Sequence, residues 1–106
     1  MIEIENLRGY YKKDAIIISL HAQERLRQRG IKQKDIKNCV MTGEIIEQYP
    51  DDFPFPSCLI FGYTVHNIVI HVVMSDEGTI GRIITAYFPN TEKFESDLRT
   101  RKGRNK

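Results

Sequence analysis

One short segment of the chain combines residue types that could cut a phosphodiester bond. Between Ser19 and Gly30 it carries a histidine, a glutamate and three arginines. At 3.6 residues per helical turn, His21, Glu24 and Arg25 fall within about a third of the helix circumference. An imidazole can exchange protons near neutral pH, a carboxylate can set its tautomer, and guanidinium groups bind phosphate. The spacing favours metal-free phosphodiester chemistry, with an ordinary solvent-exposed helix face as the alternative.

Two helices must position this segment. Ser19 is suited to cap the first helix, and Gly30 to follow its last turn in a left-handed conformation. Ala22 and Leu26 form the apolar strip of that helix, beside the polar face. A second helix is expected from about Gln33 to Thr42, stopped by the glycine that follows.

The remaining pattern predicts an α+β fold. A short amphipathic helix is expected from Met1 to about Lys12, and Ala15 to Ile18 is a brief apolar run of strand type. After position 43 the period becomes that of strands, which are expected over residues 45–49, 58–64, 67–75 and 79–88. Residues 67–75 are apolar on both faces, which is typical of a central strand.

The end of the chain is expected to form a last helix. Pro89 ends the final strand, and a helix from Glu92 to about Arg101 would pack back through Phe94 and Leu98. We therefore expect N-terminal helices and a C-terminal helix on a roughly four-stranded antiparallel sheet. On the last strand, simple alternation places Ile83, Thr85 and Tyr87 together on one face.

Size and composition indicate one domain, over residues 1–101, followed by a basic tail over residues 102–106. With 41% hydrophobic residues the chain can build a core. It contains no run of 18 apolar residues and does not begin like a signal peptide, so we expect a cytoplasmic protein with no membrane partner.

The charges are segregated along the chain. Between Arg8 and Lys37 nine Lys/Arg accompany three Asp/Glu, whereas Glu44 to Glu77 holds six acids and no Lys or Arg. The last eight residues add five positive charges. Such a distribution could steer a polyanion toward the helices and the tail, or dock an acidic protein, or merely keep the domain soluble.

Several short motifs in a fixed order resemble the domain-of-unknown-function 4258 family of small prokaryotic proteins. They cover the chain from about Ile17 to Phe94 and comprise His21-Ala22-x-Glu24-Arg25-Leu26-x-x-Arg29-Gly30-Ile31, Asp35-Ile36, Thr42-Gly43-Glu44-Ile45-Ile46-Glu47-x-Tyr49-Pro50 and Ile84-Thr85-Ala86-Tyr87-x-Pro89. The resemblance implies a fold like that of the small RelE-like ribonuclease toxins, and a place in a toxin–antitoxin pair. The implied partners are RNA, including ribosome-bound RNA, and an antitoxin protein.

The candidate site residues come mainly from these motifs. His21, Arg25 and Tyr87 are the candidate catalytic residues, with His21 as acid or base, Arg25 on the phosphate and Tyr87 as proton donor or stacking ring. Glu24 and Thr85 are supporting polar members of the same motifs. The candidate RNA-binding residues are Arg29, inside the motifs, and Arg99 and Arg101, outside them.

Alternatives stay open at this point. Arg25 or Arg29 could pair with Glu24 or Asp35 and only hold two helices together.

His71 lies mid-strand among valines, which favours a neutral buried histidine. No histidine or cysteine spacing is typical of a metal site, so no metal or other cofactor is expected. The second functional class is a non-catalytic protein-interaction module that docks through a sheet edge or the His21 helix.

Overall fold

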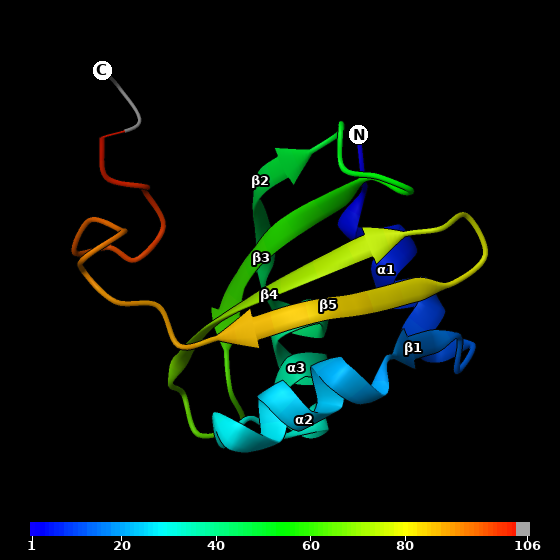
Figure 1. Ribbon diagram of the computed structural model, residues 1–106, viewed down its shortest axis with the longest axis horizontal. Coiled ribbons are helices and arrows are strands. Elements are labelled where there is room, and N and C mark those ends of the chain that lie inside the picture. Colours follow the sequence, from blue (N-terminus) through cyan, green and yellow to red (C-terminus); the bar gives the residue numbers. More distant parts are fainter. Residues whose placement is uncertain (104–106) are drawn as a thin grey trace.

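The computed structural model describes residues 1–103, which form three helices and five strands (Figure 1). The helices are α1 (Ile4–Lys12), α2 (Leu20–Gln28) and α3 (Gln33–Thr42). The strands are β1 (Ile16–Ile18), β2 (Glu44–Tyr49), β3 (Ser57–Tyr63), β4 (Val69–Asp76) and β5 (Gly81–Tyr87). The expected α+β class and the three expected N-terminal helices are confirmed.

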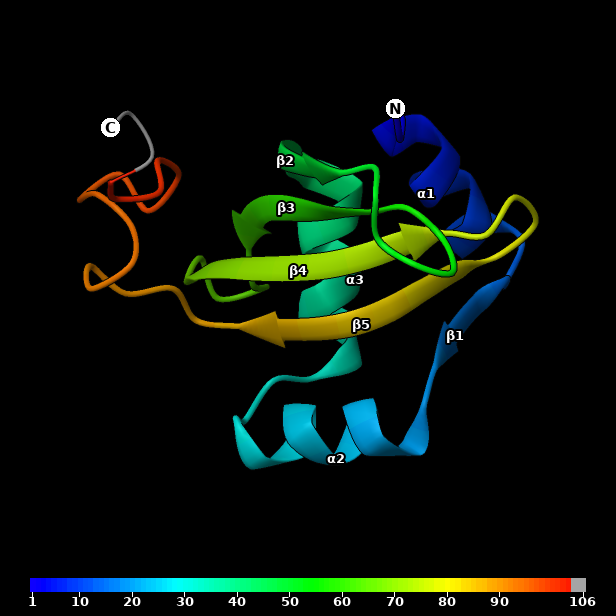
Figure 2. The same ribbon diagram turned by 45° about the horizontal axis from the view of Figure 1, so that its top comes forward.

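The sheet has the order β1-β5-β4-β3-β2. Strands β2 to β5 pair antiparallel, as expected, and β4 is the central strand. The expectation of four strands was wrong, because β1 pairs parallel to β5 and adds a fifth strand at the edge. Three paired residues are too short a run for alternation to predict a partner strand. Figure 2 shows α3 crossing behind the strands and α2 running beside β5.

Helices cover one face of the sheet, which we call the helix face. Helix α3 packs on β3 and β4 through Ile36, Cys39 and Val40, all fully buried. The contact is close, because a Cβ atom at Gly62 would lie 2.8 Å from the Cys39 Sγ. The buried residues that the strands contribute to this face are Cys58, Ile60, Ile70, Val72, Met74, Ile83 and Ala86.

The alternation predicted along β5 breaks at a β-bulge. Val73 pairs with Thr85, but the next residue, Met74, pairs with Ile83, so Ile84 is an extra residue in β5. Ile83 is consequently buried on the helix face instead of sharing a face with Thr85 and Tyr87. Those two residues keep the opposite face, which we call the open face of the sheet.

The predicted C-terminal helix is wrong, because residues 88–103, here named the C-terminal segment, form turns without a helix. The side chains of Asn90 and Asp97 accept hydrogen bonds from backbone amides two or three residues later, which competes with helix formation. Leu98 has a φ of 58°, outside the helical region. Phe94 nevertheless packs back and is buried. Of the predicted basic tail, residues 104–106 lie outside the described residues.

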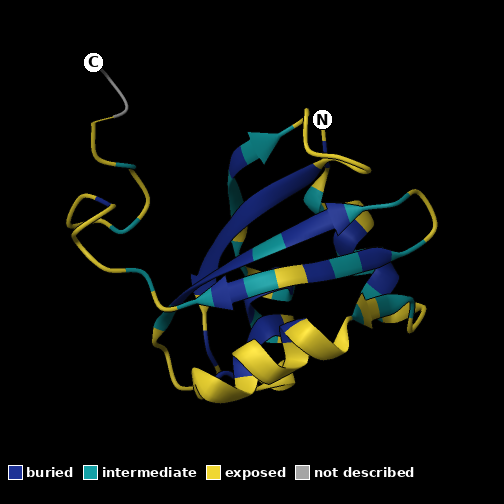
Figure 3. Cartoon of the chain, in the orientation of Figure 1, coloured by how far each residue is buried: buried dark blue, intermediate teal, exposed yellow. Residues whose placement is uncertain are grey.

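Figure 3 shows how burial is distributed. Buried residues concentrate in the central strands, whereas the outward surface of α2 and most of the C-terminal segment are exposed. Polar residues that could meet a ligand therefore lie around the sheet rather than inside the helix layer.

Candidate functional site

Helix α2 has the local signals that its sequence predicts. The Ser19 Oγ accepts the Ala22 backbone amide at 3.1 Å, and Gly30 follows the last turn with a φ of 72°. Ala22 and Leu26 are buried, as expected. The polar side of α2 is therefore fixed toward solvent.

His21 and Arg25 are exposed on this polar side. Neither side chain makes a hydrogen bond or ion pair with any residue from 1 to 103. Glu24 does not orient the imidazole, because its carboxylate binds Arg27 at 2.5 and 3.0 Å. That bond lowers the pKa of Glu24. The arginine that pairs with Glu24 is thus Arg27.

Arg29 reaches from the end of α2 to β5. Its Nη1 atom donates to the Thr85 Oγ1 at 2.9 Å and to the Ala86 carbonyl oxygen at 2.8 Å. Strand β1 pairs with β5 only as far as Ile83, and no other described strand continues along that edge. The guanidinium group supplies the donor that a neighbouring strand would supply. It thereby fixes the end of α2 against β5.

An open hollow of about 510 Å³ lies beside Arg29, between the end of β5 and the C-terminal segment. We name it the Tyr87 hollow. Its cationic and phenolic lining residues are Arg29, Lys93, Arg101, Tyr49 and Tyr87, and the others are Val73, Phe88, Pro89, Asn90 and Phe94. None of the lining residues within the described chain is acidic. Three cations and two phenols suit an anionic ligand that carries rings.

His71 lies behind Tyr87, fully buried in β4. The two residues are cross-strand partners, and the His71 Nδ1 is 3.3 Å from the Tyr87 hydroxyl. The His71 Nε2 is 2.7 Å from the Leu98 carbonyl oxygen, which can only accept, so Nε2 carries the proton. In a neutral imidazole Nδ1 then accepts from the phenol. His71 therefore orients the Tyr87 hydroxyl through a tautomer that the C-terminal segment fixes.

Burial determines the proton states of this pair. Removal from water lowers the pKa of His71 below its ordinary value of 6.5, although the Leu98 carbonyl favours the charged form. Burial also raises the pKa of Tyr87 above its ordinary value of 10.0, against the opposing charge of Arg101. At neutral pH the imidazole is neutral and the phenol keeps its proton. Tyr87 is therefore a proton donor in this setting.

A second polar group joins the C-terminal segment to the open face. The Glu47 carboxylate, buried on β2, accepts from the Tyr49 hydroxyl at 2.5 Å and from the Arg101 Nη2 at 3.2 Å. Arg101 also lies over the Phe94 ring, 4.8 Å from its centre. Burial, followed by the bond to Glu47, raises the pKa of Tyr49. Arg101 therefore lines the hollow with its positive charge partly neutralised by Glu47.

Arg99 does not line the Tyr87 hollow. Its guanidinium carbon lies 4.0 Å from the centre of the Phe61 ring, and the group forms an ion pair with Glu44. Arg99 and Arg101 are therefore both engaged with the sheet.

The structure brings together part of the predicted site. Arg29, Tyr87 and Arg101 line one hollow, and Thr85 adjoins it through its bond to Arg29.

His21 and Arg25 are not lining residues of that hollow, so the expected convergence of these two residues with Tyr87 is not found. Arg29 comes one turn after Arg25, at the C-terminal end of α2, where its side chain donates to Thr85 and Ala86 of β5.

Sequence reasoning missed Tyr49, Lys93 and the role of His71. Regular pairing from Asp76 and Gly81 would place His71 opposite Ala86, and the bulge at Ile84 brings it opposite Tyr87 instead, so this pair had no signal in the sequence. Tyr49 lies within one of the quoted motifs. Lys93 had no local signal, since it reaches the hollow only through the irregular path of the C-terminal segment.

Comparison with known families finds one family model that matches part of the chain. The model of a domain of unknown function, DUF4258, matches residues 18–88. The chain belongs to the DUF4258 family. The matched range includes Arg29, Tyr49 and Tyr87, whereas Lys93 and Arg101 follow it. No curated protein and no solved structure matches the chain of this DUF4258 protein.

Residues 1–103 hold neither a metal-binding cluster nor a membrane-spanning helix. No group of three or more His, Cys, Asp or Glu residues is arranged to hold a metal ion there. No helix in that range has the length and apolar character needed to cross a membrane. Cys39 and Cys58 are free and buried, and burial raises the pKa of both thiols to about 12.

Proposed function

We propose that this DUF4258 protein is a RelE-like toxin component of a toxin–antitoxin pair, which binds RNA in the Tyr87 hollow and cleaves it without a metal ion. The observation that carries the proposal is the lining of that hollow by Arg29, Lys93, Arg101 and two phenols, with no acidic lining residue among residues 1–103. Guanidinium and ammonium groups suit a phosphate, and phenol rings can stack on unpaired bases. Free RNA, ribosome-bound RNA and an antitoxin are the proposed partners.

In this proposal the RNA supplies its own nucleophile. The 2′-oxygen attacks phosphorus, and the bond from phosphorus to the 5′-oxygen breaks. The Tyr87 hydroxyl turns from the His71 Nδ1 and gives its proton to the departing 5′-oxygen. The proton of the 2′-hydroxyl passes to water, and the products carry a 2′,3′-cyclic phosphate and a 5′-hydroxyl. Arg29 and Lys93 stabilise the charge that builds on the phosphate oxygens.

Tyr87 acts here as an acid rather than as a base relayed by His71. Moving its proton to His71 would take the proton from a phenol with a pKa above 10.0 and give it to an imidazole with a pKa below 6.5. That transfer is unfavourable, because burial disfavours both the charged imidazole and the charged phenol. His71 is accordingly a positioning residue for the phenol.

The other predicted residues take peripheral roles in the proposal. His21 and Arg25 are exposed on α2 and carry no intramolecular partner within the described range, so they are available to the RNA strand beyond the reacting phosphate. Glu24 holds Arg27 on the same surface, and Thr85 holds Arg29 in place. Arg99 binds the sheet and reaches RNA only if its pair with Glu44 opens.

The decisive experiment has two parts. The protein is expressed under control in a bacterial host and the RNA ends are mapped, and the purified protein is assayed for RNA cleavage with EDTA present. We expect growth arrest and new 5′-hydroxyl ends. Tyr87→Phe keeps the ring and removes the proton, so cleavage should fall about 10²- to 10⁴-fold with RNA binding retained. Lys93→Ala should weaken RNA binding and lower the slope of log affinity against log salt by about one.

The matched control is Lys12→Ala, an exposed lysine at the end of α1 that does not line the Tyr87 hollow. It should leave cleavage and the salt slope unchanged. Intact RNA in the wild-type assay, together with equal growth arrest by wild type and Tyr87→Phe, would contradict the proposal.

A non-catalytic protein-interaction module is the second candidate function. It is favoured by the engagement of Arg99 with Glu44 and of Arg101 with Glu47, because cations paired within the molecule are less available to RNA. Under this alternative, Lys93→Ala leaves RNA affinity unchanged, and the chain does not arrest growth.

A further inference from the structure

The two edges of the sheet are protected to different degrees. At the β2 edge the Gln48 side-chain amide donates to the Ile2 carbonyl oxygen at 2.9 Å and accepts the Ile2 amide at 3.1 Å. The N-terminal residues therefore cover this edge. Strand β2 also carries Glu44 and Glu47 and is interrupted by a register shift. Charges, bulges and covering segments are the devices by which proteins prevent unwanted strand pairing.

The β1 edge has none of these devices within its own three residues. It consists of Ile16, Ile17 and Ile18, pairs with β5 without a register shift, and Ile17 is 39% exposed. No other strand of residues 1–103 pairs with its outer side. An aliphatic, regular edge of this kind is a template for another strand.

The backbone groups at the β1 edge have defined directions. The Ala15 carbonyl oxygen accepts from Gly81 at 3.0 Å, so the groups of Ala15 and Ile17 face β5. Because direction alternates along a strand, those of Ile16 and Ile18 face outward. The outward Ile18 carbonyl is bound by Gln23 at 2.9 Å. The remaining outward groups, the Ile16 amide and carbonyl and the Ile18 amide, are available for pairing.

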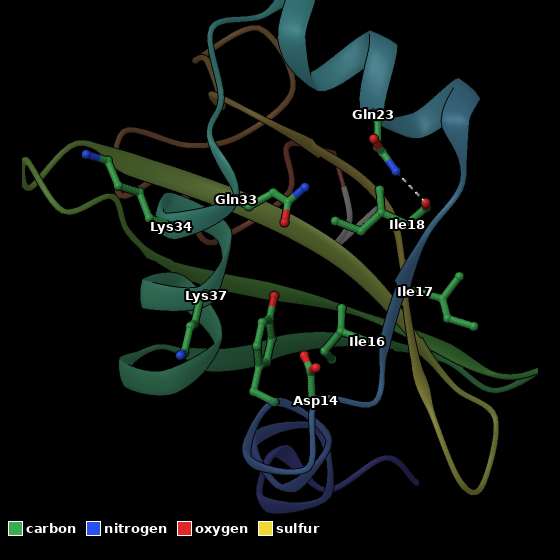
Figure 4. Close-up of a pocket in the computed structure, with 9 residues that line it drawn as sticks. Asp14, Ile16, Ile17, Ile18, Gln23, Gln33, Lys34 and Lys37 are labelled. Atoms are coloured by element: carbon green, nitrogen blue, oxygen red, sulfur yellow. Dashed lines mark hydrogen bonds between the residues drawn. The ribbon is translucent and has the colours of Figure 1, made fainter.

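A hollow of about 610 Å³ lies next to this edge, and we name it the β1 hollow (Figure 4). Figure 4 shows Ile16 and Ile18 of β1 on one side and Gln33 and Lys37 of α3 on the other. Alternate side chains of a strand added to β1 would extend over this space. Among residues 1–103, this hollow and the Tyr87 hollow share no lining residue.

The charge around the β1 hollow selects an acidic occupant. Lys34 and Lys37 line it, are exposed, and make no ion pair within the described chain. Asp14 is the one acidic lining residue among residues 1–103. Lys12 and Lys13 precede it at the end of α1 and are also exposed. A segment bearing carboxylates would therefore be attracted here, and a basic one repelled.

We infer that the outer edge of β1 receives an extended acidic segment of a partner protein, which pairs with Ile16 and Ile18 as a sixth strand and directs carboxylates at Lys34 and Lys37. Main-chain hydrogen bonds would provide affinity, and the lysines would provide charge specificity. The inference does not depend on RNA cleavage, because the two hollows are separate.

The test uses the full chain labelled with ¹⁵N and a synthetic eight-residue peptide of alternating Glu and Val with blocked ends. We expect chemical-shift changes at Ile16, Ile18, Lys34 and Lys37, and slower hydrogen exchange of the Ile16 and Ile18 amides. A Lys–Val peptide should not bind. Binding should also be lost when the Glu–Val peptide is N-methylated at alternate residues, because this removes the backbone N–H groups on the edge that pairs with β1.

Protein variants separate charge from backbone pairing. Lys34→Glu combined with Lys37→Glu should lower the affinity for the Glu–Val peptide at least about tenfold, since two attractions become repulsions. Lys102→Glu, an exposed lysine in the C-terminal segment, should change affinity less than about twofold. Tyr87→Phe should bind the peptide like wild type, which separates this inference from the proposed RNA site.

The inference is overturned if millimolar Glu–Val peptide leaves the four resonances unchanged. It is equally overturned if the shifts fall on the exposed side of α2, or if the double lysine variant binds the peptide as tightly as wild type.

Discussion

The open face of the sheet buries ionisable side chains among apolar ones, whereas the buried strand residues of the helix face are all apolar. The helix face meets α1 and α3 through apolar side chains, such as Ile60, Val72 and Met74, all fully buried. The open face buries His71 and Glu47, and an irregular segment rather than a helix covers them. A helix satisfies its own backbone groups, so it offers little to a polar neighbour. A segment with unpaired carbonyls and free side chains can satisfy such residues.

The open face is also complete in its hydrogen bonding. Within the described residues, every buried side-chain nitrogen or oxygen has a partner. His71 uses the Leu98 carbonyl and the Tyr87 hydroxyl, and Glu47 uses Tyr49 and Arg101. A fully satisfied polar network holds side chains in single positions. The difference teaches that the helix face stabilises the fold, while the open face fixes the geometry of the candidate site.

The largest expected effect lies on the helix face. Ile60→Ala removes a fully buried side chain that α3 covers, and the surroundings can collapse only partly. The free energy of unfolding should fall by about 2–5 kcal/mol. Urea denaturation followed by circular dichroism measures it. Ile84→Ala, at the exposed bulge residue, is the control and should change the midpoint little. Equal effects of the two variants would contradict the assignment of the core.

This face is the part of the molecule that sequence predicts well. Local signals identify α2 from Ser19 to Gly30, and apolar residues on both faces identify β4 as central. The partner of β1 and the bulge at Ile84 are not local properties, because they depend on contacts between distant segments. The C-terminal segment misled the prediction, since the spacing of Phe94 and Leu98 suits a helix.

The candidate site divides in the same way. Arg29 and Tyr87 could be selected from their motifs, and they do line one hollow. His21 and Arg25 were selected from helical spacing, which defines a face of α2 but not what that face meets. Lys93 could not be selected, because the turns that place it leave no periodic pattern in the sequence.

A smaller stability effect is expected on the open face. Glu47→Gln removes the charge that holds Arg101, and the arginine is more than a third exposed, so solvent screening reduces the loss. The free energy of unfolding should fall by about 1–2 kcal/mol. Hydrogen exchange should quicken in residues 98–103 more than in α3. Glu24→Gln, which breaks only the exposed pair with Arg27, should leave the midpoint unchanged. Exchange that quickens equally throughout would contradict a local role for Glu47.

The pH dependence of stability provides a sharper test of the buried imidazole. Burial lowers the pKa of His71 in the folded state, so the unfolded chain binds a proton first as pH falls. Stability is therefore intact above pH 6.5 and declines below it, toward the lowered folded pKa, by at most about 1.4 kcal/mol per pH unit. Urea midpoints at pH 7.5, 6.5 and 5.5 measure the slope. His71→Asn should flatten it, and the exposed His21→Asn should not.

The smallest effect is expected where the open face meets α2. Thr85→Val removes one of two acceptors of Arg29 and keeps the side-chain shape, while the Ala86 carbonyl still receives the guanidinium. The exposed setting limits the stability loss to less than about 1 kcal/mol. RNA affinity should fall less than about tenfold with an unchanged salt slope, because no charge is removed. Fluorescence anisotropy with labelled RNA at two salt concentrations measures both quantities. An RNA affinity that falls as far in Thr85→Val as in Arg29→Ala would mean that the hydroxyl, rather than the guanidinium, meets the RNA.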